Sequence, residues 1–168
     1  VTLRPHWMTI NNNPSLVSKI IESQKNCRTF KIENDLSSIN SLISSDILIS
    51  DLSGVALEYA FGLLKPVVYI DIPMRSRNSD FDAINLPAFE VEKRSQTGII
   101  VAPKKLADIP NIITNLNSDD SFQKNITKLR KKSVFNLGTS GSVGANYLFD
   151  LIQQDDISPH KKNLVKPI

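Results

Sequence analysis

Residues 46–71 constrain the fold of this chain more than any other stretch. An apolar run at Ile47–Ile49 is followed by a polar turn at 50–54, and a second apolar run covers Val67–Ile70. A strand of a parallel sheet that is covered on both faces requires such an uninterrupted run. The intervening residues, 54–64, suit one helix. The stretch therefore predicts a strand–helix–strand unit with two parallel strands.

The same alternation extends to both sides of this unit. Repeated strands and helices at this spacing favour an α/β fold, with a Rossmann-like parallel sheet and helices on both faces. The expected strands are 1–3, 27–32, 46–50, 66–70 and 98–101. The expected helices cover about 14–21, 35–43, 54–64, 106–117, 122–134 and 145–153, the second capped by Asn34 or Asp35.

The pattern predicts one Rossmann-like nucleotide-binding domain at 1–154 and a polar tail at 155–168. Between 73 and 94 the periodicity lapses, and Leu86-Pro87 argues against a helix there. A long irregular insert within a domain is often a functional loop. Because Val1 already belongs to an expected strand, we expect an upstream part of the protein to be missing.

Composition excludes several classes of protein. No run approaches the roughly 20 apolar residues of a membrane span, and no signal peptide opens the chain. A single cysteine, Cys27, cannot form an internal disulfide, so we expect a cytoplasmic protein in which Cys27 is small and buried.

The basic residues gather late, at 128–132 and at Lys161, Lys162 and Lys166. They form either a solvated face or a surface for anionic lipid headgroups or a polyanionic acceptor, which would hold the protein at the inner face of the cell membrane. No aromatic residues interleave with them, so nucleic acid is not an expected partner.

Three polar clusters follow expected strands: Arg4-Pro5-His6, the turn Asp51–Gly54, and Asp71. Carboxyl ends of parallel strands lie at one edge of a sheet, where ligands bind. After the turn, a helix begins at Gly54 and its free amides and dipole attract phosphate. The sequence therefore predicts an anion site at this edge.

Each residue of the turn has a functional and a structural interpretation. Ser53 suits an N-cap and also a hydroxyl donor to a phosphate oxygen. Glu58, one turn into the helix, either accepts from two ribose hydroxyls or is simply an exposed glutamate. Asp51 either orients a ligand or bonds the amides of its own turn. Asp51 and Asp71 without a third ligand do not predict a metal site.

His6 is the one histidine before the tail. At a strand end it would act as general base on a hydroxyl, bind phosphate as a cation, or lie partly buried behind Trp7. Arg75, Arg77 and Arg94 are candidate phosphate clamps, because a guanidinium matches phosphate in a fork, or else solvated surface arginines.

The run Gly138–Gly144 has glycine at every third residue but lacks the lysine of a P-loop. It is either a flexible helix start, capped by Ser140 or Ser142, or a set of amides that contact a diphosphate or an acceptor.

Together these motifs resemble a known family. The residues Arg4-Pro5-His6, 51–60, 65–71 and Gly138-Thr139-Ser140 are similar to the C-terminal half of CDP-glycerol glycerophosphotransferases. That family contains the polymerases and primases of teichoic-acid-type polymers, with relatives in capsule synthesis. The resemblance spans about 1–152.

The resemblance implies the C-terminal domain of a two-domain GT-B-type transferase that needs no cofactor and is inactive without its N-terminal acceptor domain. His6 would be catalytic, with CDP-glycerol as donor and a polymeric hydroxyl as acceptor. The turn Ser53-Gly54 would match the donor diphosphate site of the family. With the candidates argued from residue chemistry and from the motifs, the expected donor-binding residues are Arg4, Asp51, Ser53, Gly54, Glu58, Arg94, Thr139 and Ser140.

Two positions depart from the family pattern. Many members carry tyrosine and a second serine where this chain has Leu52 and Gly54. Ser53-Gly54 followed by Glu58 is closer to sugar-nucleotide transferases and epimerases. A UDP-sugar glycosyltransferase or epimerase-like domain therefore stays an alternative, as does a non-catalytic nucleotide-binding module.

Overall fold

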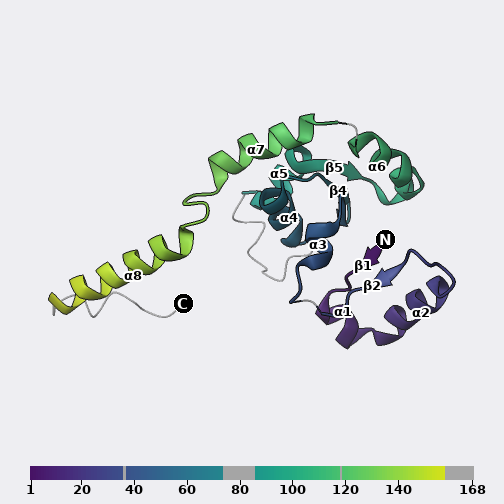
Figure 1. The fold of residues 1–168 in the computed structure, drawn as a ribbon, viewed down its shortest axis with the longest axis horizontal. Coiled ribbons are helices and arrows are strands. Elements are labelled where there is room, and N and C mark those ends of the chain that lie inside the picture. The colour runs from purple at the N-terminus through teal and green to yellow at the C-terminus, as the bar shows by residue number, and fades with distance from the viewer. Residues whose placement is uncertain (36, 74–85, 118, 158–168) are drawn as a thin grey trace. The chain divides into compact units, whose positions relative to one another are not determined.

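The computed structural model describes residues 1–35, 37–73, 86–117 and 119–157 (Figure 1). The chain forms two compact units, Val1–Ile126 and Thr127–Ile168. Their boundary falls within helix α7 (Ser121–Ser133). Each unit is described by itself below.

The first unit is α/β, with every described strand pairing parallel. Strand β1 (Thr2–Leu3) pairs with β2 (Lys31–Ile32). Strands β3 (Leu48–Ser50), β4 (Val67–Ile70) and β5 (Gly98–Val101) form a second sheet in that order. The expected parallel strands are thus present, but the described part of the chain divides them between two small sheets. Strand β1 is short in part because Pro5, two residues after it, has no N–H to donate.

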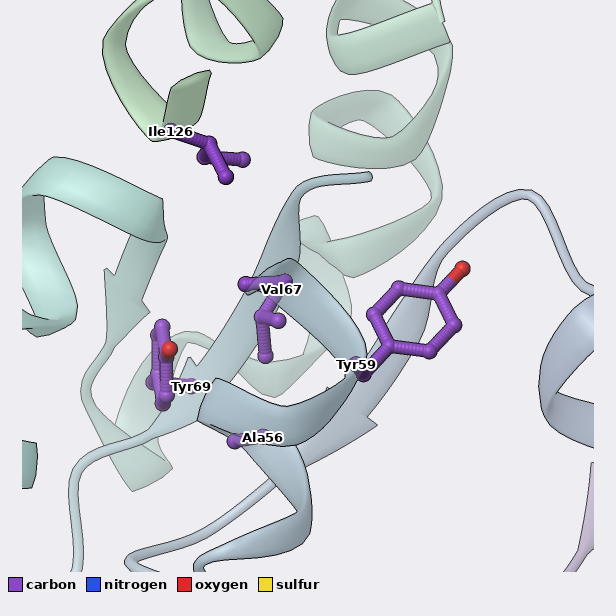
Figure 2. Packing of buried hydrophobic residues seen from close by; sticks show 6 residues of the cluster. Ala56, Tyr59, Val67, Tyr69 and Ile126 are labelled. Atoms are coloured by element: carbon purple, nitrogen blue, oxygen red, sulfur yellow. The ribbon is translucent and has the colours of Figure 1, made fainter. Parts of the chain in front are cut away.

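Strand β4 is the centre of the three-stranded sheet, and consecutive side chains on it are buried on opposite faces. Val67 and Tyr69 pack with Ala56 and Tyr59 of α4 (Val55–Leu63) and with Ile126. Figure 2 shows this cluster where α4 crosses β4, with the Tyr59 hydroxyl pointing away from the other labelled side chains.

The opposite face of β4 is covered by helix α6 (Ile109–Asn117), which follows a short 3-10 helix at Pro103–Asp108. Val68 packs there with Val101 of β5 and Leu116 of α6. Helices therefore cover both faces of this sheet, as the sequence predicts (Figure 1). The prediction that both faces of β3 are covered is wrong, because Ile49 is 46% exposed while α6 packs on β4 and β5.

Strands β4 and β5 approach so closely at one point that only glycine fits. Gly98 pairs with Val67, and a Cβ at position 98 would lie 1.7 Å from the Val67 carbonyl oxygen. The backbone of Gly98 is extended, so space rather than conformation requires the glycine.

Near the N-terminus the structure adds a helix that the sequence did not predict. Helix α1 (Trp7–Asn12) precedes the expected α2 (Pro14–Gln24), and the Asn13 side chain caps α2 by accepting from the Leu16 amide. The expected strand at 27–32 is only the two residues of β2. The prediction that Cys27 is buried is wrong, because the thiol is exposed.

Two helical predictions in the middle of the chain also change. Helix α3 covers only Asn40–Ser44, and Asp35 does not cap it but accepts from Ser37 in a local turn. Helix α5 (Phe89–Thr97) occupies part of the insert that was expected to be irregular. Pro87 precedes Ala88, the extended residue before the helix, so this proline marks the start of α5 rather than preventing it.

The expected inward face of α7 is confirmed: Ile126 is fully buried, Leu129 is 7% exposed, and Phe122 packs against both clusters. In the second unit, α8 runs from Ser140 to Ile157, longer than the expected 145–153. The first residues of the predicted tail are therefore helical, and the rest, 158–168, lies outside the described residues with His160 and its lysines.

Candidate functional site

The carboxyl edge of the three-stranded sheet gathers the central residues of the predicted site. Ser50, the last residue of β3, pairs with Tyr69, one residue before the end of β4. Asp51 therefore follows β3 at the same edge of the sheet at which Asp71 follows β4. The turn 51–54 and the Asp71 region are thus neighbours along this edge.

The N-terminus of α4 opens at this edge without a capping side chain. Gly54, not Ser53, is the N-cap residue, and its φ of −56° and ψ of −29° are already helical. The Ser53 carbonyl accepts from the Ala56 amide at 3.0 Å, and the Gly54 carbonyl accepts from Leu57 and Glu58. In the described part of the chain, the Gly54 and Val55 amides have no hydrogen-bond partner. Two backbone donors at the positive end of a helix are therefore available to an anion.

The start of α4 also has negative charge near it, on the carboxylates of Asp51 in the turn and Glu58 in the helix. Asp51 and Glu58 are both exposed and make no ion pair with any described residue. Glu58 lies in the first turn of α4, where a negative charge interacts favourably with the helix dipole. The same charge would repel a phosphate that approached within a few ångströms.

Arg94 forms an ion pair with the carboxylate of Asp71. Its Nη1 donates to Asp71 Oδ1 at 3.2 Å, and its side chain is only 11% exposed, against 51% for Asp71. The Arg94 Nε is buried without a hydrogen-bond partner in the described residues. This pair joins α5 to the end of β4. It leaves Asp71, rather than Arg94, as the more accessible group.

The hydroxyls of Tyr69, on β4, and Thr97, at the end of α5, form a buried pair. Tyr69 and Thr97 are hydrogen-bonded at 2.6 Å, and Thr97 also donates to carbonyls of α5. Burial raises the pKa of the Tyr69 hydroxyl, although the Thr97 bond and the charge of Arg94 act in the other direction.

His6 follows β1 and caps α1. Its Nδ1 accepts from the Met8 amide at 3.2 Å, and its ring lies 5.8 Å from that of Trp7. This hydrogen bond assigns the neutral tautomer that carries the proton on Nε2. His6 is exposed, so the alternative of a histidine partly buried behind Trp7 is wrong.

Arg4 is held by the segment that leads into α3. Its Nη1 donates to the Ser38 carbonyl at 2.7 Å and to Ser41 Oγ at 2.9 Å, and it lies 4.0 Å from the Glu33 carboxylate. The guanidinium therefore connects the end of β1 to the start of α3.

Thr139 and Ser140 belong to the second unit. Thr139 Oγ1 donates to the Asn136 carbonyl at 3.3 Å, and its own carbonyl accepts from Ser142 Oγ. Ser140 begins α8. Arg75 and Arg77 lie outside the described residues.

Sequence reasoning did not assign Lys65 a role in the fold. Its Nζ donates to the Ile43 and Ser45 carbonyls at the end of α3, at 3.1 and 2.6 Å. The Tyr59 hydroxyl also donates to the Ser45 carbonyl. No spacing in the sequence indicates contacts between residues about 20 positions apart.

Among the described residues, no three His, Cys, Asp or Glu side chains gather closely enough to hold a metal ion. No described helix is both long and apolar enough to cross a bilayer. The chain matches no protein-family model, no curated protein and no solved structure.

Proposed function

We propose that this chain is the donor-nucleotide-binding half of a transferase that moves glycerol phosphate from CDP-glycerol to a hydroxyl of a teichoic-acid-type or capsular polymer. The observation that carries the proposal is the uncapped start of α4 at the carboxyl edge of a parallel sheet. The Gly54 and Val55 amides there, which donate to no described residue, suit the oxygens of a diphosphate. The resemblance in residues 51–60 and 65–71 supports the choice of donor.

The proposal includes one continuous sheet in the order β2-β1-β3-β4-β5. In the described residues β1 and β3 each use only one edge, and all pairings are parallel. The contacts of Arg4 with Ser38 and Ser41 hold the end of β1 beside the segment that leads to β3. In this order β2 follows β1 on one side of the sheet, whereas β3, β4 and β5 follow on the other side. The switch point therefore lies between β1 and β3, and doubly wound sheets bind nucleotides at such a point. Pairing of β1 with β3 would bring His6 to the turn at Ser53.

In the proposed reaction, an acceptor hydroxyl oxygen attacks the β-phosphorus of CDP-glycerol. A new oxygen–phosphorus bond forms, the bond from that phosphorus to the bridging oxygen breaks, and CMP leaves with the electron pair. The proton of the acceptor passes to water. The amides of Gly54 and Val55 would stabilise the charge on the phosphate oxygens.

The tautomer of His6 favours one of its two expected roles. Because Nδ1 already accepts from the Met8 amide, the ring presents an N–H at Nε2 rather than a lone pair. His6 would therefore donate to a phosphate oxygen instead of removing the proton of the acceptor.

Titration calorimetry with CDP-glycerol, CDP, UDP and a UDP-sugar tests the donor site. We expect the cytidine nucleotides to bind more tightly than the uridine nucleotides. The variant Gly54→Asp should bind CDP at least about tenfold more weakly, because a carboxylate at the helix start repels phosphate. A Cβ at position 54 has no neighbour within 4 Å, so the fold accommodates it.

Gly62→Asp is the matched control, because position 62 is equally open and lies at the other end of α4. It should bind CDP as the unmodified chain does. Equal binding by both variants, or no nucleotide binding at all, would refute the proposed site. A preference for UDP would favour the UDP-sugar alternative, and nucleotide binding without transfer in the intact protein would favour a non-catalytic module.

A further inference from the structure

Helix α7 carries its charge on the side opposite to the one that it buries. It is one continuous helix, so the side on which Phe122 and Ile126 pack into the core fixes the direction of every other side chain on it. At about 100° per residue, the opposite side carries four exposed lysines, which are called here the α7 lysine face. These are Lys124, Lys128, Lys131 and Lys132.

The α7 lysine face has no opposite charge on its own helix. Neither α7 nor residues 134–149 contain Asp or Glu. None of the four lysines forms an ion pair with a residue that the structure describes. The nearest acidic residues along the chain, Asp119 and Asp120, precede the helix, and Asp119 accepts from the Ser121 amide there. Positive charge is therefore concentrated along the rest of α7.

The mild net charge of the chain conceals this concentration. Residues 121–149 hold five basic residues, the four lysines and Arg130, and no acidic one. Their net charge is +5, whereas that of the whole chain is +3, so the other residues together carry −2. Like charges four residues apart, as at Lys124 and Lys128 or at Lys128 and Lys132, destabilise a helix. An anionic partner over the α7 lysine face would remove that repulsion.

The shape and chemistry of the α7 lysine face suit a charged surface better than a single chain. The four lysines spread over about 100° of the helix circumference and, from Lys124 to Lys132, over about 12 Å of its axis, which is a patch rather than a narrow track. Lysines act as point charges, whereas a single phosphate is recognised best by the fork of an arginine. Clusters of basic residues on a helix are attracted by anionic lipid headgroups. No aromatic side chain lies among the four lysines for a base to stack on, which argues against single-stranded nucleic acid.

We propose that the α7 lysine face binds the surface of a lipid bilayer that contains anionic headgroups. Amphipathic membrane helices usually bury their apolar side among the acyl chains. The apolar side of α7 is not available for this, because Ile126 is fully buried in the protein core and Leu129 is 7% exposed. The contact is therefore electrostatic, without insertion, and salt should reverse it. This surface does not depend on the proposed nucleotide site, and it stands if that site is refuted.

Co-sedimentation of the full chain with vesicles of equal parts phosphatidylglycerol and phosphatidylcholine tests the proposal. We expect binding that is absent with phosphatidylcholine alone. The binding should be lost between about 0.05 and about 0.5 M NaCl, because the Debye length falls about threefold over this range. The triple variant Lys124→Gln, Lys128→Gln, Lys131→Gln should bind about 100-fold more weakly, since each lysine near an anionic surface contributes about fivefold.

The matched control is the triple variant Lys19→Gln, Lys104→Gln, Lys105→Gln, which removes three exposed lysines elsewhere and changes the net charge equally. It should bind the vesicles as the unmodified chain does. Glutamine has a helix propensity close to that of lysine, so both triple variants should keep the far-ultraviolet dichroism of the unmodified chain, which excludes misfolding as the cause of weaker binding.

Four results would overturn the proposal. The first is an unmodified chain that does not bind the anionic vesicles, and the second is equal weakening by the two triple variants, which would assign the binding to net charge alone. The third is binding that persists at about 0.5 M NaCl, since apolar insertion would then be responsible. The fourth is binding to soluble polyphosphate but not to vesicles, lost in the α7 triple variant, which would make a linear polyanion the partner.

Discussion

The closest backbone approach in the sheet gives the sharpest test of the fold. In Gly98→Ala, the added methyl group would lie 1.7 Å from the Val67 carbonyl oxygen and 2.6 Å from its carbonyl carbon. Carbon–oxygen contacts are normally about 3.3 Å or longer, so β5 would have to move by roughly 1.5 Å at this point. The two strands cannot keep their register at Val67↔Gly98 after such a shift.

The size of the effect follows from what this movement disrupts. Overpacking costs about 1–3 kcal/mol, and a lost strand hydrogen bond about 1 kcal/mol more. We therefore expect Gly98→Ala to lower the free energy of unfolding by about 3 kcal/mol. With a urea dependence of about 2 kcal/mol per M, the midpoint should fall by about 1.5 M.

Gly62→Ala is the matched control, because it adds the same methyl group to open space in α4. It should stabilise the chain by up to about 1 kcal/mol, since alanine restricts the unfolded chain and favours helix. Urea unfolding followed by circular dichroism measures both variants. If Gly98→Ala is as stable as the unmodified chain, β4 and β5 do not pair in this register.

Three further predictions concern side-chain contacts. Burial raises the pKa of the Tyr59 and Tyr69 hydroxyls above 10.0, the pKa of an ordinary tyrosine. The stability that these two hydroxyls contribute is therefore complete below pH 10.0 and is lost as pH rises through their folded pKa. Tyr69→Phe should therefore lose less stability than the unmodified chain in urea unfolding between about pH 8 and about pH 11, and an equal loss would contradict the burial of this hydroxyl. Lys65→Met should lower the free energy of unfolding by about 1 kcal/mol, because it removes the donor at the end of α3, and an unchanged thermal midpoint would show that these bonds do not persist. Replacement of Arg94 by Met and of Asp71 by Asn should show a coupling of at least about 0.5 kcal/mol in a double-mutant cycle, whereas additive effects would mean that the two residues do not pair.

The elements that the sequence predicted well are those whose pattern alone determines burial. The run Val67–Ile70 is the central strand, and Ile126 and Leu129 mark the inner face of α7. These residues are predictable because strand burial requires a continuous apolar run and helix burial requires a 3.6-residue period. The start of α4 beside the turn 51–54 was likewise visible in the sequence.

Other features depend on which elements meet, and local patterns do not carry that information. Ile49 has the same apolar character as Val68, yet it is exposed because α6 covers β4 and β5 and does not extend over it. Arg94 was expected to be either a phosphate clamp or a solvated surface arginine, and no local pattern indicated that α5 brings its guanidinium to Asp71, 23 residues earlier. Whether such a side chain is available to a ligand is decided by its neighbours in space.

The sequence by itself determined the α/β class, the parallel strand–helix–strand unit at 46–71 and the polar residues at its strand ends. Periodicity and turn chemistry are local properties, and they are sufficient for these features. Only the tertiary structure decided that the Ser53 side chain does not cap α4, and that among the described residues the Gly54 and Val55 amides have no hydrogen-bond partner. These features depend on distances between atoms that the order of residues along the chain does not specify.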